Sequence, residues 1–244
     1  MVNYYKDKVC LNVLAGSKEN AKDIYQAAGK CVLVGVLSID YPGVKSAVND
    51  MKDYMDILEG NLSVGLGAGN PKQCLVVGDI AKEIKANHFN QVFTSVAYTR
   101  ANVNNNTSLI NCLVSPTGRP GYVKISTGPL SSTATEAAIV PVDVAAKMCI
   151  DMGGTSLKFF PMKGLSCKEE LIEVAKACAL NDLILEPTGG IDIDNFKEIV
   201  ELSLKHGVKK VIPHVYSSII DKETGNTRIE DVKVLMKLVK EILD

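Results

Sequence analysis

The chain has 244 residues, of which 46% are hydrophobic and only 5% aromatic, with no tryptophan. This length is close to the roughly 250 residues of a single (β/α)8 barrel and too short for two large domains. The 27 basic and 28 acidic residues leave a net charge of -1, which argues against nucleic acid or an anionic membrane as a partner.

Seven cysteines are scattered along the chain without a C-x-x-C pair. The odd number and the wide spacing argue against a disulfide framework and against a zinc ribbon. The first residues contain no apolar segment like that of a secretory signal, and no window approaches 18 apolar residues. We therefore expect a cytoplasmic protein.

Short apolar segments recur at fairly even intervals and predict eight strands. They are Val9–Leu14, Cys31–Leu37, Leu62–Leu66, Val92–Ala97, Tyr122–Ile125, Ser156–Phe160, Leu183–Leu185 and Lys210–Val215. Helical patterns lie between most of them, often with Ser, Asp or Pro at the start and Gly at the end. They are Lys18–Ala28, Val44–Leu58, Gln73–Ala86, Val144–Met152, Leu171–Ala179, Phe196–His206 and Glu230–Leu243.

This alternation predicts an α/β fold, a (β/α)8 TIM barrel formed by one domain over residues 1–244. A doubly wound open sheet is the rival fold. The least regular stretch, Tyr98–Gly121, is rich in Asn, Ser, Thr, Pro and Gly, and we expect a hairpin there instead of a full helix. In a barrel the chemistry sits at the carboxyl ends of the strands, and polar residues and glycines concentrate at those positions in this chain.

Lys158 lies inside an apolar predicted strand, where a charged side chain is unusual. A lysine in water has a pKa of about 10.4, so nearly all of it is protonated at neutral pH. Burial favours the neutral amine, which can attack a carbonyl carbon. Strand alternation puts Phe160 on the same face, beside the amine. The pattern makes Lys158 a candidate Schiff-base nucleophile, and a lysine that reaches solvent or forms an ion pair at a strand end is the alternative.

A second lysine, Lys124, competes for this function. The segment Val123–Gly128 resembles the catalytic strand of the deoxyribose-phosphate aldolases, which also use a Schiff-base lysine. Lys124 could otherwise bind a phosphate or carboxylate, or lower the pKa of Lys158 as a neighbouring cation. We expect Lys124 at the site and Lys158 as the nucleophile.

Thr188, Gly189 and Gly190 follow the seventh predicted strand and precede the start of a helix. Glycines allow the backbone to approach an anion closely, and free N–H groups at a helix terminus supply donors. Ser217 and Ser218 follow the eighth predicted strand. We expect these residues to form a phosphate site between strands seven and eight, although Thr-Gly-Gly could also be an ordinary tight turn.

Glu186 is the preferred acid–base group because it lies at a strand end near Lys158, and a structural ion pair is its alternative. His214 is a candidate proton carrier or hydroxyl ligand on the last predicted strand. His88 and His206 lie near predicted helix ends and are expected to take no part. No Asp, Glu or His cluster has the spacing of metal ligands, so neither a metal nor another cofactor is expected.

The segment Lys158–Pro161, followed by Pro187–Ile191, resembles the 2-keto-3-deoxy-6-phosphogluconate (KDPG) aldolases. More closely, the whole chain resembles the branch of this activity found in bacterial D-glucosaminate breakdown. The stretches that carry this resemblance are Val9–Ser17, Ser63–Gly69 and Ile212–Asp221.

The resemblance implies a class I aldolase that cleaves 2-dehydro-3-deoxy-6-phosphogluconate to pyruvate and D-glyceraldehyde 3-phosphate. In that family the lysine forms the pyruvyl Schiff base and the Thr-Gly-Gly turn contributes to the phosphate end. Related aldolases assemble, so a homo-oligomer is expected.

Two features of the better-known KDPG aldolases are missing from this chain. Their strand-two glutamate and the arginine after it have no counterpart in Val34–Asp40, and their Gly-Ala-Gly-Thr appears as Gly67–Asn70. Asn70 and Arg100 are therefore our candidates for the substrate carboxylate, with Arg119 as an alternative to Arg100.

Two other kinds of function stay open at this point. A cofactor-free phosphosugar isomerase or epimerase would use Glu186 and His214 as bases without a covalent step. A non-catalytic sugar-phosphate binder would use the same anion site without turnover.

Overall fold

The computed structural model describes all 244 residues and contains one large sheet of seven parallel strands in the order β1-β2-β3-β4-β5-β8-β9. Their bounds are β1 Leu11–Leu14, β2 Val32–Leu37, β3 Leu62–Gly65, β4 His88–Phe89, β5 Leu109–Val114, β8 Ser156–Phe159 and β9 Ile184–Pro187. The strands are nearly uniformly buried, which is typical of a parallel sheet covered on both faces. The prediction of an α/β fold is confirmed.

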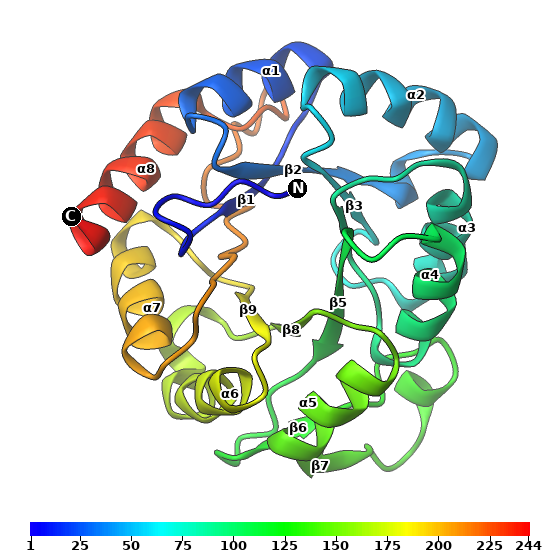
Figure 1. Ribbon diagram of the computed structural model, residues 1–244, viewed down its shortest axis with the longest axis vertical. Helices are drawn as coiled ribbons and strands as arrows, with labels where there is room; N and C mark the ends of the chain where they lie inside the picture. Colours follow the sequence, from blue (N-terminus) through cyan, green and yellow to red (C-terminus); the bar gives the residue numbers. More distant parts are fainter.

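The sheet is curled, so that its two edge strands approach each other across one short segment (Figure 1). In that segment, Val211 forms isolated parallel bridges with Val9 and with Leu185. His214 forms bridges with Asn12 on β1 and with Thr188, which follows β9. The last of the eight predicted strands therefore lies where expected, but it contacts both edges through single bridges instead of a continuous ladder.

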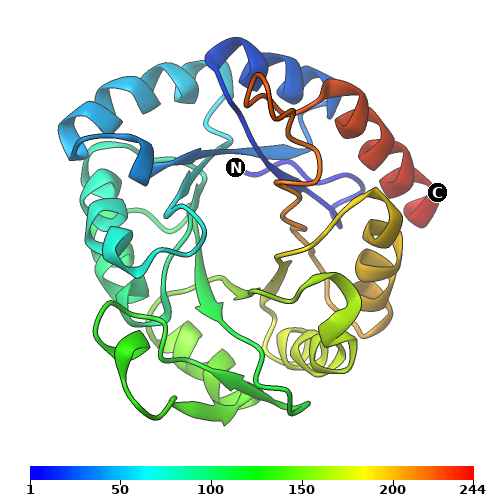
Figure 2. The same ribbon diagram turned by 180° about the vertical axis from the view of Figure 1, so that it is seen from behind.

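Eight α-helices surround the sheet on its outer side (Figures 1 and 2). They are α1 Lys18–Ala27, α2 Val44–Ile57, α3 Cys74–Glu83, α4 Val96–Val103, α5 Val142–Asp151, α6 Lys168–Leu180, α7 Ile193–Lys205 and α8 Ile229–Leu243. Side-chain caps mark where two of the helices begin. The Ser17 side chain accepts a hydrogen bond from the Asn20 N–H at the start of α1. Asp192 and Asn195 form a capping box at the start of α7. None of the helices is both long and apolar enough to cross a membrane.

The predicted fourth strand, Val92–Ala97, is wrong. Its residues form a 3₁₀ turn and the start of α4, and the fourth strand of the sheet is the two-residue β4. The stretch Tyr98–Gly121 is not a hairpin, because it holds most of α4 and all of β5. A short apolar run can be buried in a helix as well as in a strand, so its composition alone does not separate the two.

The predicted fifth strand, Tyr122–Ile125, lies outside the main sheet. It forms β6, Tyr122–Lys124, which pairs antiparallel with β7, Ile139–Pro141. This two-stranded hairpin belongs to the long connection between β5 and α5 (Figure 1). Backbone hydrogen bonds between Ser115 and Lys124 attach it just beyond the carboxyl end of β5.

Candidate active site

Lys158 is the third residue of β8 and lies in register with Leu113 on β5 and Glu186 on β9. The residue is 8% exposed, and its Nζ donates one hydrogen bond, to Asn90 Oδ1 at 2.7 Å. No carboxylate lies within ion-pair distance of the amine. Burial lowers the pKa of Lys158 to about 8, although the charge of Glu186 acts in the opposite direction. About a tenth of the amine is thus neutral at pH 7, far more than for a lysine in water.

Two adjoining cavities lie at the carboxyl ends of the strands and share five lining residues: Leu37, Ala68, Phe160, Thr188 and Tyr216. The inner one, of about 50 Å³, contains Lys158 and Asn90. The outer one, of about 720 Å³, is lined by Lys163, His214, Ser217 and the pair Gly189-Gly190, called the diglycine from here on. Together they form a tapered cleft with the amine at its inner end, large enough for a small sugar acid.

The turn after β3 borders the inner cavity with three backbone N–H groups. Gly67, Ala68 and Gly69 have φ angles of 85°, 45° and 70°, in the left-handed region. None of their N–H groups donates a hydrogen bond within the protein. Consecutive free N–H groups in a concave turn form a nest that binds anions. The turn is therefore a candidate anion site in the same cavity as Lys158.

The diglycine forms the wall of the outer cavity and requires glycine at its second position. A Cβ on Gly190 would lie 2.5 Å from the Gly164 nitrogen, and its φ is 71°. The N–H groups of Gly189, Gly190 and Ile191 donate no hydrogen bond within the protein.

We expected free backbone N–H groups at the start of α7 to bind an anion. In the structure these N–H groups already donate hydrogen bonds within the protein. The N–H groups of Asp194 and Asn195 both donate to the Asp192 carboxylate. The donors that remain for an anion are therefore those of the diglycine loop itself.

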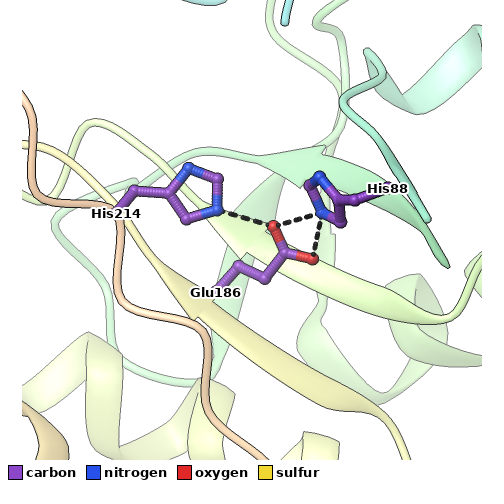
Figure 3. A group of neighbouring side chains, drawn as sticks. All are labelled: His88, Glu186 and His214. Carbon is purple, nitrogen blue, oxygen red and sulfur yellow. Dashed lines mark hydrogen bonds and ion pairs between the residues drawn. The ribbon is translucent and has the colours of Figure 1, made fainter. Parts of the chain in front are cut away.

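Glu186 is completely buried and surrounded by hydrogen-bond donors. Its carboxylate accepts from Asn111 Nδ2 at 2.7 Å and from the Ser156 hydroxyl, and it contacts the Nε2 atoms of both His214 (2.8 Å) and His88 (3.1 Å). Figure 3 shows the two imidazole rings converging on the carboxylate from opposite sides. Burial alone would raise the pKa of Glu186, but His88 and His214 hold it well below its usual range.

This position changes the expected function of Glu186. The side chain is 0% exposed and lines neither cavity. It neighbours Lys158 in register without contacting the amine, so it has no direct access to a substrate. His88, expected to take no part, is instead a buried member of the same cluster. The sequence pattern does not indicate this position, because β4 has only two residues.

His88, Glu186 and His214 also offer three ligand atoms within 4.8 Å of one another, a grouping that the sequence spacing did not reveal. Histidine and carboxylate are common metal ligands. Here, however, both imidazoles already contact the carboxylate, and the three side chains are 0% exposed. The arrangement fits a buried hydrogen-bonded network. We assign no catalytic step to a metal at this cluster.

The structure brings some predicted site residues to the cleft. Phe160 and Thr188 line both cavities, and Gly189, Gly190 and Ser217 line the outer one. Ser218 lies beside it, and its hydroxyl donates to the Ile191 carbonyl at 2.7 Å.

Three other predicted site residues lie outside the cleft. Asn70 uses its side chain to cap the turn that starts at Pro71. Arg100 donates to the carbonyls of Gly153 and Ser108, which precede β8 and β5, so it lies at the amino ends of the strands and cannot hold the substrate there. Lys124 is held in the β6–β7 hairpin and lines neither cavity.

The chain matches the model of one protein family, described as KDGP aldolase, over residues 5–223. The chain belongs to the KDGP aldolase family. It is therefore an aldolase, and so a lyase. It is 44% identical over 246 positions to the "2-dehydro-3-deoxy-phosphogluconate aldolase" of Salmonella typhimurium, with 99% of each chain covered. The resemblance that the sequence motifs carry to this family is confirmed.

More distant structures resemble this aldolase in fold alone. A thiamine phosphate pyrophosphorylase from Pyrococcus furiosus has a TM-score of 0.60 at 13% identity, with 98% of both chains covered. A mutant tryptophan synthase α-subunit from the same organism has a TM-score of 0.56 at 15% identity, with 97% of this chain and 98% of that one covered. At such low identity the likeness says nothing about which residues react.

Proposed function

We propose that this aldolase cleaves 2-dehydro-3-deoxy-6-phosphogluconate to pyruvate and D-glyceraldehyde 3-phosphate through a Schiff base on Lys158. The observation that carries the proposal is the buried Lys158 amine, held by a single neutral acceptor in a cavity that also contains an anion nest. Family membership and the name of the Salmonella relative support the substrate. The test is turnover of this compound by the purified chain, with pyruvate measured as product.

The neutral Lys158 amine attacks the C2 carbonyl, and loss of water gives a protonated imine. This imine withdraws electrons, so the C3–C4 bond breaks when the C4 hydroxyl loses its proton. The aldehyde leaves, and an enamine of pyruvate remains on the lysine. Protonation at C3 and hydrolysis then release pyruvate and restore the amine.

The two anion sites orient the substrate along the cleft. The nest of Gly67, Ala68 and Gly69 would hold the carboxylate next to the reacting carbonyl, in place of Asn70 and Arg100. The diglycine loop, with Ser217, would hold the phosphate in the outer cavity. Lys163, which is not among the predicted site residues, is the one lysine that lines this outer cavity, and no arginine lines it.

We also propose that the curled sheet is a closed (β/α)8 barrel. The bridges that Val211 and His214 make to β1 and to the β9 side support closure, with this segment as the eighth strand.

The rate of cleavage is expected to rise with pH as Lys158 loses its proton. With a pKa of about 8, the amine is mostly protonated at pH 6 and mostly neutral at pH 9. Because the neutral form is the nucleophile, kcat/KM should increase about tenfold per pH unit below this pKa and level off above it. A pH–rate profile of the free enzyme measures this, and a profile that is flat from pH 6 to 9 would contradict the assignment.

Replacing Lys163 with alanine is expected to weaken binding of the phosphate end without changing the chemistry. The side chain is exposed and makes no ion pair within the protein, so its removal leaves the fold unchanged. We expect KM for the phosphorylated substrate to rise about tenfold, with kcat changed by less than about twofold. The neighbouring variant Lys168→Ala serves as control, because Lys168 pairs with Glu198 on α7. An equal loss with a substrate analogue that lacks the phosphate would argue against this function of Lys163.

A further inference from the structure

The proposed reaction needs a group that takes the C4 hydroxyl proton, and Glu186 has no access to the cleft. The titratable side chains that line the two cavities are Lys158, Lys163, His214 and Tyr216. Lys158 forms the covalent bond, and Lys163 lines the outer cavity at the diglycine end. Tyr216 is the one of these that lines both cavities, so it borders the amine end and the phosphate end of the cleft without forming the covalent bond.

The hydroxyl of Tyr216 connects the cleft to the buried carboxylate. Its oxygen lies 2.8 Å from Nδ1 of His214, and Nε2 of the same ring lies 2.8 Å from a Glu186 oxygen. The same phenol oxygen lies 3.0 Å from Asn12 Oδ1. This is the order of groups in a catalytic triad, with a hydroxyl, an imidazole and a buried carboxylate that orients the ring.

The phenol proton of Tyr216 can be donated to either of two acceptors, His214 Nδ1 or Asn12 Oδ1. Which of them accepts it depends on whether His214 is neutral or protonated. When His214 is neutral, its Nε2–H donates to Glu186, so Nδ1 accepts the proton of Tyr216. When His214 carries a second proton, Nδ1–H donates to the phenol oxygen, and the phenol proton turns to Asn12 Oδ1. In both states the phenol proton and His214 Nδ1 have a partner already in place, so a proton can move without rearrangement of the chain.

The resting state is the one in which His214 can accept a proton. Burial lowers the pKa of His214 to about 3, and the positive charge of Lys158 acts in the same direction. The ring is therefore neutral at physiological pH and receives the phenol hydrogen bond. After proton transfer the imidazolium lies 2.8 Å from the Glu186 carboxylate, which stabilises its charge.

We propose that Tyr216 is the catalytic residue that exchanges protons with the substrate, and that His214 and Glu186 position and serve it. This inference rests on the proposed function. As the C3–C4 bond breaks, the C4 hydroxyl proton passes to the Tyr216 oxygen while the phenol proton passes to His214 Nδ1. The bond electrons go to the imine and form the enamine. The relay then runs in reverse: Tyr216 gives its proton to C3, and His214 returns its proton to Tyr216.

The test is the variant Y216F, which removes the hydroxyl and keeps the ring. We expect the rate of cleavage to fall by about 10² to 10⁴-fold, the usual size of general acid–base catalysis. Exchange of the pyruvate methyl protons with D₂O, followed by NMR, should fall by a similar factor. Borohydride trapping of pyruvate on Lys158 should persist, because formation of the imine uses the amine. Y98F, on the outer surface of α4, is the control and should change none of these.

A double-mutant cycle with H214N separates the relay from a structural effect. If Tyr216 acts through His214, the double variant should lose little more activity than Y216F alone. Multiplied losses would mean that the two residues act independently and would overturn the relay. Should Y216F fail to fold, 3-fluorotyrosine at position 216 keeps the contacts and is expected to change the exchange rate several-fold, and an unchanged rate would overturn the proposal.

The possible failures are distinguishable. If the wild-type chain neither cleaves the substrate nor traps pyruvate, the proposed function is wrong. If the wild type does both and Y216F cleaves within about twofold of it, Tyr216 is not the proton carrier. If Y216F loses trapping as well as cleavage, Tyr216 is needed to form the imine, and the step assigned to it is wrong.

Discussion

Replacing Lys158 with methionine is expected to lower cleavage by roughly 10⁴-fold or more, because the covalent intermediate can no longer form. Methionine is unbranched and fills the buried space of the lysine stem without an ammonium group, so the fold should be retained. The measurement is kcat for pyruvate release, together with thermal unfolding to confirm that the variant is folded.

The matched control is Lys124→Met. Lys124 lies in the β6–β7 hairpin and lines neither cavity, so this variant should keep most of its activity. The opposite pattern, with activity lost in K124M and kept in K158M, would favour the alternative in which Lys124 is the nucleophile. Full pyruvate release in both variants would mean that neither lysine forms a covalent intermediate, and would contradict the Schiff-base mechanism.

Replacing Glu186 with alanine is expected to cost about 3–5 kcal/mol in the free energy of unfolding. The carboxylate accepts hydrogen bonds from Asn111 and Ser156 and contacts the ε-nitrogens of His88 and His214, all of which are buried. Its removal leaves these groups without a partner and with no access to water. Denaturant unfolding at neutral pH, monitored by circular dichroism, measures the loss.

The variant Glu186→Gln separates the loss of charge from the loss of shape. The amide keeps one acceptor oxygen but places an NH₂ group against donors, so we expect a smaller loss of stability than in E186A. A loss below about 1 kcal/mol in E186A would be that of an ordinary surface residue and would contradict the buried network described here.

Much of the fold could be predicted from the sequence, because the relevant signals are local. Apolar β-branched runs such as Cys31–Leu37 locate strands, and Ser17 and Asp192 mark helix starts that the structure confirms. The segment around Lys158 was predicted as a buried strand with an amine inside it, and β8 shows that burial.

The polar interior was much harder to predict. β4 has only two residues, and its neighbourhood Asn87-His88-Phe89-Asn90 is too polar to resemble a buried strand. As a result His88 and Asn90 were overlooked, although both contact groups at the centre of the site. Their partners Glu186 and Lys158 lie 98 and 68 positions away, which no local pattern can show.

Arg100 failed as a site candidate for a related reason. Its position was inferred from a predicted strand that is a helix in the structure, so it lies at the opposite end of the strands. The anion sites that we propose instead consist of backbone N–H groups at Gly67–Gly69 and in the diglycine loop. A site made of backbone N–H groups is indicated in the sequence only by its glycines, and glycine also occurs in turns and helix ends that bind nothing.

The most direct test of the central claim is mass spectrometry of the wild-type protein after borohydride reduction with pyruvate. If the buried amine is the nucleophile, one reduced pyruvyl group should be found per chain, on the peptide that contains Lys158 and on no other. Protein that stays unlabelled while it cleaves the substrate, or that carries the label on Lys124, would contradict it.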